Sequence, residues 1–413
     1  MFALAAYSGA QTLEECLRAA EKNYPLVSQY DLIRQTRLHD LSNIDKEWLP
    51  QLSASAQATY QNRVAEWPSG VRSLMSQNGV NIEGLGKDQY KIGVDLTQKI
   101  YDGGQSRHQK SVVRLEGEYE TAELDISVYA VRQRVIELFF SSLLLEERWQ
   151  LAKNLLSYMK SNEEKLSSML NNGTASLSDY NNMKAERISV ETQIIDLECQ
   201  HSTAIQLLQV LCGMEIHTLQ KPSWGMMTGA NNHPELKAVE SQLRLIDAKE
   251  KLLDSALLPK VGLFATGYYG YPGYNMFDDM MSNDWSLNGI VGLKVTWNIG
   301  ALYTRRSDKA KLKLMRNTAE SRLDTFLFNN NMEQRQHSAN IDRYARVMER
   351  DDEVISLRSS VRKAAESRLD HGIIDVSELV RNIKEENDAK VQKAIHETEI
   401  MKEEAELRNT LNQ

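Results

Sequence analysis

The stretch LPQLSASAQATY, which runs from Leu49 to Tyr60, alternates apolar and polar side chains for almost its whole length. Successive side chains of a β-strand point to opposite faces, so this pattern predicts a strand with one apolar and one polar face. A related stretch, LLPKVGLFATGYY, runs from Leu257 to Tyr269. Each stretch directly follows a charged run with helical character. A chain otherwise rich in helix therefore carries one such strand in each half.

The composition favours a helical protein and excludes some functions. The 413 residues are enough for two or three domains, and 26% of them are charged. No apolar run approaches the roughly 18 residues that a membrane-spanning helix needs. The net charge of -8 argues against a nucleic-acid partner, because such a protein would present a basic face.

The three cysteines, Cys16, Cys199 and Cys212, do not form a disulfide framework, because their number is odd and their spacings are unrelated. Cys199 and Cys212 lie on one predicted helix, about 20 Å apart at the usual rise per residue, which is too far for a bond. A bridge from Cys16 to either of them stays open. We favour inert buried thiols.

The N-terminus resembles the end of an export signal. Phe2 to Ala6 is apolar, and Ser8-Gly9-Ala10 has the small residues of a cleavage site. The basic segment that opens such signals is missing, so either the start is truncated or the match is chance. We interpret 1–10 as a signal-peptide remnant, with the mature chain starting near Gln11.

Internal repetition divides the rest of the chain into two copies. NYP at 23–25 corresponds to NHP at 232–234, and LP at 49–50 corresponds to LP at 258–259. NG at 172–173 corresponds to HG at 371–372. All these pairs are offset by about 200 residues, which marks a repeat architecture. We assign 11–220 to the first repeat and 221–413 to the second.

Each repeat is expected to contain two short helices, two strands and one long helix. In the first we expect a helix at 24–48, strands at 50–61 and 90–101, a long helix at 105–170, a turn at 171–176 and a helix at 177–215. In the second we expect a helix at 234–257, strands at 259–271 and 287–299, a long helix at 303–369, a turn at 370–375 and a helix at 376–411. Apolar residues recur at steps of three and four along 105–170, which indicates a left-handed coiled coil.

The strands carry two distinct faces, and their length of about 10 residues suits a tilted strand that crosses a bilayer. We expect the apolar face to contact lipid and the polar face to line a wet lumen. Aromatic residues also gather at the strand ends, as in the interfacial girdles of membrane barrels. Four strands cannot close such a barrel, which needs at least about eight, so several chains must contribute. The alternative is an ordinary soluble sheet, half-buried. The expected lipid-facing residues are Val94, Leu96, Val295 and Trp297, and the expected lumen-facing residues are Lys91, Asp95, Lys99 and Lys294.

The order of motifs resembles the TolC family of outer-membrane efflux proteins. The first copy reads QTLEECLRAAEKNYP, LPQLSASAQATY, LTQKIYDGGQSR and NNGTASLSDY, and the second reads NHPELKAVES, LLPKVGLFATGYY, VTWNIGALYTRR and LDHGIIDVSEL. The resemblance implies a homotrimer whose chains share a 12-stranded β-barrel in the outer membrane and a long coiled-coil α-helical barrel in the periplasm. It also implies two partners, a periplasmic adaptor protein and an inner-membrane transporter.

The turns between the paired helices are the candidate functional sites. Gly173 and Gly372 suit the left-handed residue that ends a helix. Ser176 and Asp375 can cap the next helix, with Asp179 and Glu378 reaching back as in a capping box. The resemblance implies that these turns form the closed periplasmic gate, where Glu378 falls at a position of a carboxylate ring. At the next such position this chain has Arg381, and Ile373 and Ile374 replace the family arginine.

No residue pattern predicts catalysis, a metal site or a cofactor. The eight histidines never lie within one helical turn of each other, and GLGKD at 84–88 lacks the remainder of a phosphate loop. We therefore expect a passive outer-membrane channel of a tripartite efflux pump or a type I secretion system. The alternative from another class is a soluble periplasmic coiled-coil scaffold or adaptor protein.

Overall fold

The computed structural model describes residues 10–80, 82, 84–225 and 230–412. Nearly all of the expected signal-peptide remnant, 1–10, lies outside these residues. The chain forms two compact units. The helical unit comprises Met1–Asp31, Thr121–Val239 and Ser321–Gln413, and the sheet unit comprises Leu32–Glu120 and Glu240–Glu320. Each unit takes segments from both sequence repeats, so the compact units cut across the repeats.

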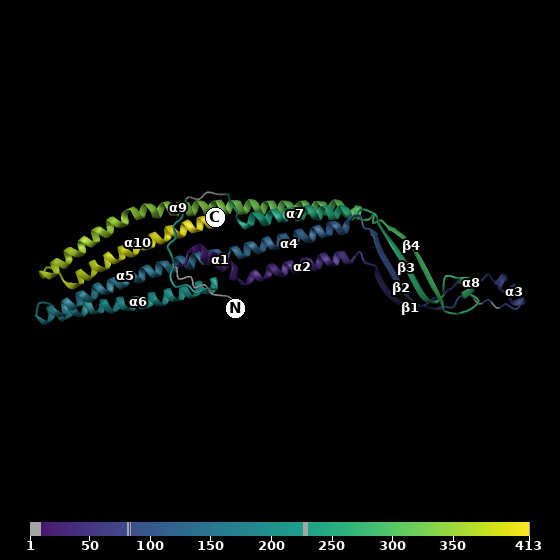
Figure 1. Cartoon of the computed structure of the whole chain (residues 1–413), viewed down its shortest axis with the longest axis horizontal. Coiled ribbons are helices and arrows are strands. Elements are labelled where there is room, and N and C mark those ends of the chain that lie inside the picture. The colour runs from purple at the N-terminus through teal and green to yellow at the C-terminus, as the bar shows by residue number, and fades with distance from the viewer. Residues whose placement is uncertain (1–9, 81, 83, 226–229, 413) are drawn as a thin grey trace. The chain divides into compact units, whose positions relative to one another are not determined.

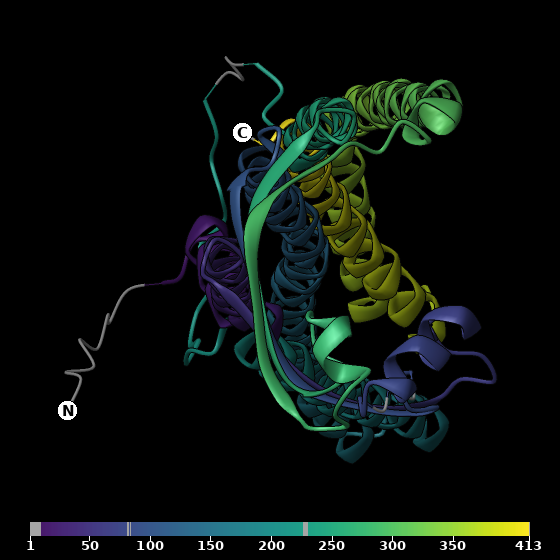
Figure 2. The same cartoon turned by 90° about the vertical axis from the view of Figure 1, so that its right-hand side faces the viewer.

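The sheet unit contains a four-stranded antiparallel sheet in the order β1-β2-β3-β4. The strands are β1 (Gln51–Tyr60), β2 (Asp88–Tyr101), β3 (Lys260–Tyr271) and β4 (Ser286–Thr296). Figure 2 shows them side by side as a curved sheet. The short helices α3 (Ser69–Gln77) and α8 (Met276–Asp279) lie in the loops at one end of the strands, and the long helices join the other end (Figure 1).

The helical unit is built from two helical hairpins, α5–α6 and α9–α10 (Figure 1). Their helices are α5 (Val131–Asn171), α6 (Leu177–Cys212), α9 (Ala301–Asp370) and α10 (Val376–Leu411). The helices α2 (Ser28–Lys46), α4 (Gln105–Tyr129), α7 (Pro234–Ser255) and α9 pass from one unit into the other. No described helix is both long and apolar enough to span a membrane.

Three of the elements expected from the sequence have a different form in the structure. The helix expected at 24–48 is a 3-10 turn, Pro25–Val27, followed by α2. The long helix expected at 105–170 is divided at Ala130 into α4 and α5, although the amide of Ala130 still donates to the carbonyl of Ile126 at 3.1 Å. Strand β4 ends at Thr296, so Trp297 lies just outside it.

A helix that the sequence analysis missed covers one end of the α5–α6 hairpin. It is α1 (Leu13–Asn23), and Thr12 and Glu15 form its capping box. Its Leu13, Cys16, Leu17 and Ala20 are buried in a cluster with residues of α5 and α6. Because α1 packs on α5 in addition to α6, this part of α5 buries more residues than the single apolar stripe of a coiled coil would. The α5 members of the cluster are Val131, Val135, Ile136, Phe139, Phe140 and Leu143.

The expectation of three inert buried thiols is wrong for one cysteine. Cys199 is exposed on α6, whereas Cys16 and Cys212 are buried. The latter two lie in the same cluster.

A pocket of about 610 Å³ lies inside the helical unit and contains charged groups from α9 and α10. His337 and Glu403 form an ion pair at 2.6 Å. Burial raises the pKa of the neighbouring Glu406 to about 7, although His337 and Lys402 act in the opposite direction. The protonated form of Glu406 is therefore favoured in the folded chain relative to the unfolded chain.

We predict that Glu406→Gln stabilises the protein at high pH only. A carboxyl group whose pKa is raised on folding makes the folded state lose stability as pH rises from its unfolded pKa to its folded pKa. That window runs from about 4.5 to about 7 here. At pH 8 the variant should gain roughly 1–3 kcal/mol in the free energy of unfolding. Near pH 4.5 it should match the wild type.

Denaturant unfolding at the two pH values measures this difference. The control is Glu198→Gln, because Glu198 is exposed on α6 and makes no ion pair with another described residue. If Glu406→Gln changed the free energy of unfolding equally at both pH values, the raised pKa of Glu406 would be wrong.

Candidate functional site

The strand register places most of the apolar strand residues on one face of the sheet, whereas Phe264 and Ile290 lie on the other face. Leu52 pairs with Leu96, and Leu96 pairs in turn with Ala265. Because directly paired residues share a face, the four strands form one continuous apolar face. The face consists of Leu52, Ala54, Ala56, Ala58 and Tyr60 of β1, Tyr90, Ile92, Val94 and Leu96 of β2, Leu263, Ala265, Gly267 and Tyr269 of β3, and Leu287, Gly289, Val291, Leu293 and Val295 of β4.

The chain leaves this apolar face uncovered. Leu287 is 83% exposed, Val291 is 75% exposed, and Leu293 and Val295 are each 67% exposed. Contiguous apolar patches of this kind are rare on soluble monomers and mark a surface that contacts lipid or another protein. The predicted residues Val94, Leu96 and Val295 belong to this face, and Trp297 does not because it follows the end of β4.

The opposite face of the sheet is mainly polar and carries the four predicted lumen residues. The hydroxyl of Thr266 donates to Asp95 at 2.6 Å, and Lys99 pairs with Glu47 at 2.6 Å. The ammonium group of Lys91 lies 5.0 Å from the ring centre of Tyr268. Lys294 makes no ion pair or hydrogen bond with the residues that the structure describes.

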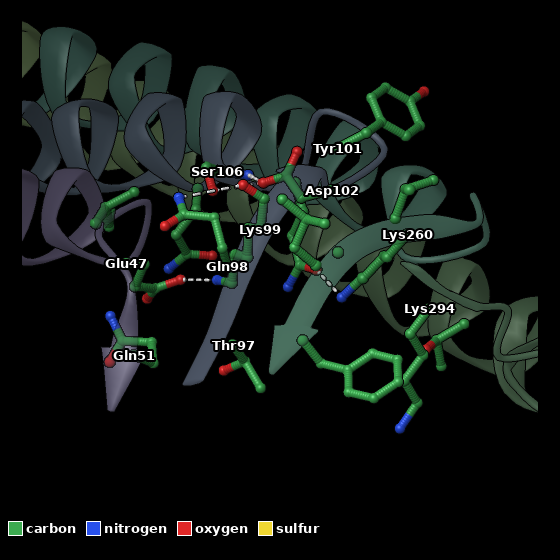
Figure 3. Close-up of a pocket in the computed structure, with 18 residues that line it drawn as sticks. Glu47, Gln51, Thr97, Gln98, Lys99, Tyr101, Asp102, Ser106, Lys260 and Lys294 are labelled. Carbon is green, nitrogen blue, oxygen red and sulfur yellow. Dashed lines mark hydrogen bonds and ion pairs between the residues drawn. The ribbon is translucent and has the colours of Figure 1, made fainter. Parts of the chain in front are cut away.

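A pocket of about 470 Å³ opens on this polar face near the helix ends. Figure 3 shows Lys99, Lys260 and Lys294 around it, together with Asp102. Asp102 is fixed by local hydrogen bonds, because it accepts from the amide of Ser106 at 2.7 Å and from the amide of Gly104 at 2.9 Å. The carboxylate thereby caps the start of α4, and the lysine side chains line the polar face beside it.

Exposed aromatic residues form two groups, one at each end of the sheet. Tyr60, Tyr90, Tyr269 and Trp285 lie at the loop end, where Trp285 packs against the rings of Tyr90 and Tyr269. Trp48, Tyr101, Trp297 and Tyr303 lie at the helix end. Two other aromatic residues of the strand ends, Tyr268 and Tyr271, are buried among the loops and belong to neither group.

The turn of the α5–α6 hairpin has the predicted construction. Gly173 has a φ of +73°, in the left-handed region that favours glycine. The amide of Thr174 returns to the carbonyl of Met169 at 2.8 Å, which closes the end of α5. Ser176 caps α6, and Asp179 completes the capping box with it.

The turn of the α9–α10 hairpin differs from the prediction at Glu378. Gly372 has a φ of +70°, and Asp375 accepts from the amide of Glu378 at 2.8 Å, as expected of a helix cap. The carboxylate of Glu378 does not complete a capping box. It pairs instead with Arg368 of α9 at 3.3 Å. Arg381 is exposed and makes no ion pair with any described residue.

The ends of the two hairpins pack against each other through a buried cluster. Met159 and Leu166 of α5 and Met183 of α6 meet side chains of the other hairpin. The partners from the second hairpin are Ala365, Leu369, Val376, Leu379, Val380 and Ile383.

Three polar contacts also join the hairpins across this cluster. Lys165 of α5 pairs with Asp370 of α9, and Lys384 of α10 pairs with Glu186 of α6 at 2.6 Å. Arg362 of α9 donates to the hydroxyl of Tyr158 of α5 at 2.6 Å. Sequence reasoning missed these contacts. Nothing in the local sequence shows which charged residue of one hairpin faces which residue of the other.

Arg362 belongs to a partly buried charge network that orders the α9–α10 hairpin. It pairs with Glu386 of α10 and with Glu366 at 2.9 Å. Burial alone would raise the pKa of Glu386, but the hydrogen bonds from Lys390 and Arg362 outweigh burial and lower it. Glu386 is therefore held ionised as an anchor for Arg362. Among the described residues, no group of three or more His, Cys, Asp and Glu side chains is arranged to hold a metal ion.

Comparisons with known proteins agree with this geometry. The family model described as outer membrane efflux protein matches residues 6–214, just over half of the chain. No curated protein matches the sequence.

Several solved structures share the fold at low sequence identity. The outer membrane protein VceC from Vibrio cholerae has a TM-score of 0.69 at 12% identity, covering 97% of this chain and 95% of that chain. The CmeC outer membrane channel of Campylobacter jejuni has a TM-score of 0.65 at 13% identity, covering 97% and 85%. The MtrE outer membrane channel of Neisseria gonorrhoeae, solved in its open state, has a TM-score of 0.67 at 14% identity, covering 97% and 88%.

Proposed function

Because the chain belongs to the outer membrane efflux protein family, we propose that three copies assemble into the exit channel of a tripartite efflux pump. Each copy contributes its four strands to one 12-stranded barrel in the outer membrane. The helical hairpins extend into the periplasm and form a tunnel there. A periplasmic adaptor protein and an inner-membrane transporter deliver the exported molecule to this tunnel. The channel itself is passive and needs no cofactor.

The observation that carries the proposal is the uncovered apolar face of the sheet. It extends over all four strands, and exposed aromatic residues flank it at both ends. A membrane barrel has this arrangement, with an apolar band facing lipid between two aromatic girdles. The opposite face carries charged and hydroxyl groups, which suits a lumen filled with water. A soluble scaffold would leave the apolar face in water, so the alternative function is disfavoured.

We predict that charge is excluded from the apolar face only. Leu96→Arg places a cation on the proposed lipid face, which costs about 2–4 kcal/mol near the middle of a barrel. Thr97→Arg is the matched control, because the neighbouring residue points to the proposed lumen. The measurement is the amount of assembled trimer in the outer membrane. Equal tolerance of both variants would show that the apolar face does not contact lipid.

We propose that the packed hairpin ends are the periplasmic gate of the channel. Around a threefold axis, the Glu378 carboxylates would form a ring that attracts cations, and Arg368 of the same chain would partly offset its charge. Separation of the two hairpins would break the Lys165–Asp370 and Lys384–Glu186 pairs and widen the entrance. The adaptor protein would stabilise this open arrangement. The ion pairs between the hairpins would hold this gate closed. The proposed gate residues are Gly173, Ser176, Asp179, Gly372, Asp375, Glu378 and Arg381.

We predict that Lys165→Ala increases the open probability of the isolated channel. Lys165 forms an ion pair with Asp370 of the other hairpin. An exposed ion pair stabilises the arrangement that contains it by about 0.2–1 kcal/mol. Its loss should shift each chain toward the open arrangement by up to roughly fivefold. Single-channel recording in planar bilayers measures the effect.

The matched control is Lys160→Ala, which removes an ion pair within one hairpin. Lys160 also lies on α5 and pairs with Glu191 of α6 at 3.7 Å, and the exposed fractions of the two lysine side chains are similar, 54% and 47%. The control should leave the open probability unchanged. The same increase in both variants would mean that the contacts between the hairpins do not hold the gate.

A further inference from the structure

Cys16 and Cys212 form a buried pair of thiols at the junction of α1 and the end of α6. Cys16 is 0% exposed and Cys212 is 3% exposed. The thiol of Cys212 donates to the carbonyl oxygen of Cys16 at 3.5 Å. The interaction between the two thiols raises the pKa of Cys16 and lowers the pKa of Cys212.

The backbone around this pair is held at both ends of α1. Gln11 exchanges two backbone hydrogen bonds with the segment after α6, to Thr218 and from Gln220, each at 2.9 Å. At the other end of α1, the amide group of Asn23 donates to the carbonyls of Val210 and Leu211 at 3.2 Å each. These contacts fix the position of α1 along α6. The two cysteines are therefore brought together by the fold and not by a local turn.

We propose that Cys16 and Cys212 form a disulfide bond in the mature protein. This bond links α1 covalently to the end of the α5–α6 hairpin. This inference rests on the proposed function for its compartment, because the periplasm favours disulfides and the cytoplasm does not. Cys199 stays a free thiol, since it is exposed on the same helix a long way from the pair.

The bond forms by exchange with a protein disulfide of the periplasm, which is the oxidant. The thiolate of one cysteine attacks that disulfide and gives a mixed disulfide, and the first sulfur of the oxidant leaves as a thiolate. The second cysteine, as its thiolate, then attacks the mixed disulfide at the sulfur of its partner, and the other sulfur of the oxidant leaves. The two protons lost by the cysteines pass to the two leaving thiolates. The pair is oxidised by two electrons, and the oxidant is reduced to a dithiol. Because both thiols are buried in the folded chain, the exchange takes place while the chain folds.

Thiol counting tests the proposal directly. The full chain is produced behind an export signal and, separately, without one. Each sample is denatured in N-ethylmaleimide, and the labels are counted by intact mass. We expect one label on the exported chain and three on the cytoplasmic chain, and three on the exported chain after reduction. Peptide mapping of the unreduced exported chain should recover a cross-link between the peptides of Cys16 and Cys212.

Single substitutions provide matched controls for the count. Cys199→Ser should leave no label on the exported chain, because it removes the free thiol. Cys16→Ser should give two labels, one on Cys199 and one on the released Cys212. Three labels on the exported wild type, or a cross-link that includes Cys199, would overturn the proposal.

Fractionation of the same cells separates this proposal from the channel. A chain found in the outer membrane with three labels overturns the disulfide and leaves the channel intact. A chain absent from the outer membrane overturns the channel. Refolding of the purified chain in oxidised glutathione then decides the disulfide by the same count, with one label supporting it and three refuting it.

Discussion

An apolar sheet face without a cover imposes the main constraint on this molecule. The four strands pair in a register that brings most apolar strand positions to one side, from Leu52 on β1 to Val295 on β4. The hydrophobic effect opposes the exposure of such a face to water, at about 25 cal/mol for each Å². No described segment of the chain covers it. The face must therefore be buried outside the chain, and the aromatic residues at both ends of the strands make a bilayer the fitting environment.

The helical unit has a different design, because its stability depends on contacts between segments that are far apart in sequence. The buried cluster at the hairpin ends fixes the two hairpins against each other, and a few exposed charge pairs add little to that packing. Such pairs are suited to a gate, since they select one arrangement without making it permanent. At the other end of the α5–α6 hairpin, α1 is fixed by backbone hydrogen bonds and by the buried cysteines. The two ends of this hairpin are thus held in different ways, by exposed charge pairs at one end and by backbone hydrogen bonds and buried side chains at the other.

The sequence predicted the features that depend on local patterns. Alternation along β1 and β2 gave their faces correctly, and the glycines Gly173 and Gly372 marked both hairpin turns. Contacts between distant segments could not be read in this way. The predicted capping box at Glu378 is absent, because the carboxylate of Glu378 pairs with Arg368 of the preceding helix, α9. Helix α1 was missed because the prediction began the first helix at residue 24. Without α1, the sequence left a bridge from Cys16 open but could not decide between Cys199 and Cys212 as its neighbour.

The mass of the assembly measures the central claim most directly. Membranes that contain the protein are extracted with mild detergent, and the mass of the complex is determined by native mass spectrometry without heating. A barrel shared between chains predicts a complex of three chains that is recovered only with detergent and separates into single chains on heating. Recovery of a single chain from the aqueous fraction, with its apolar face in water, would contradict the account.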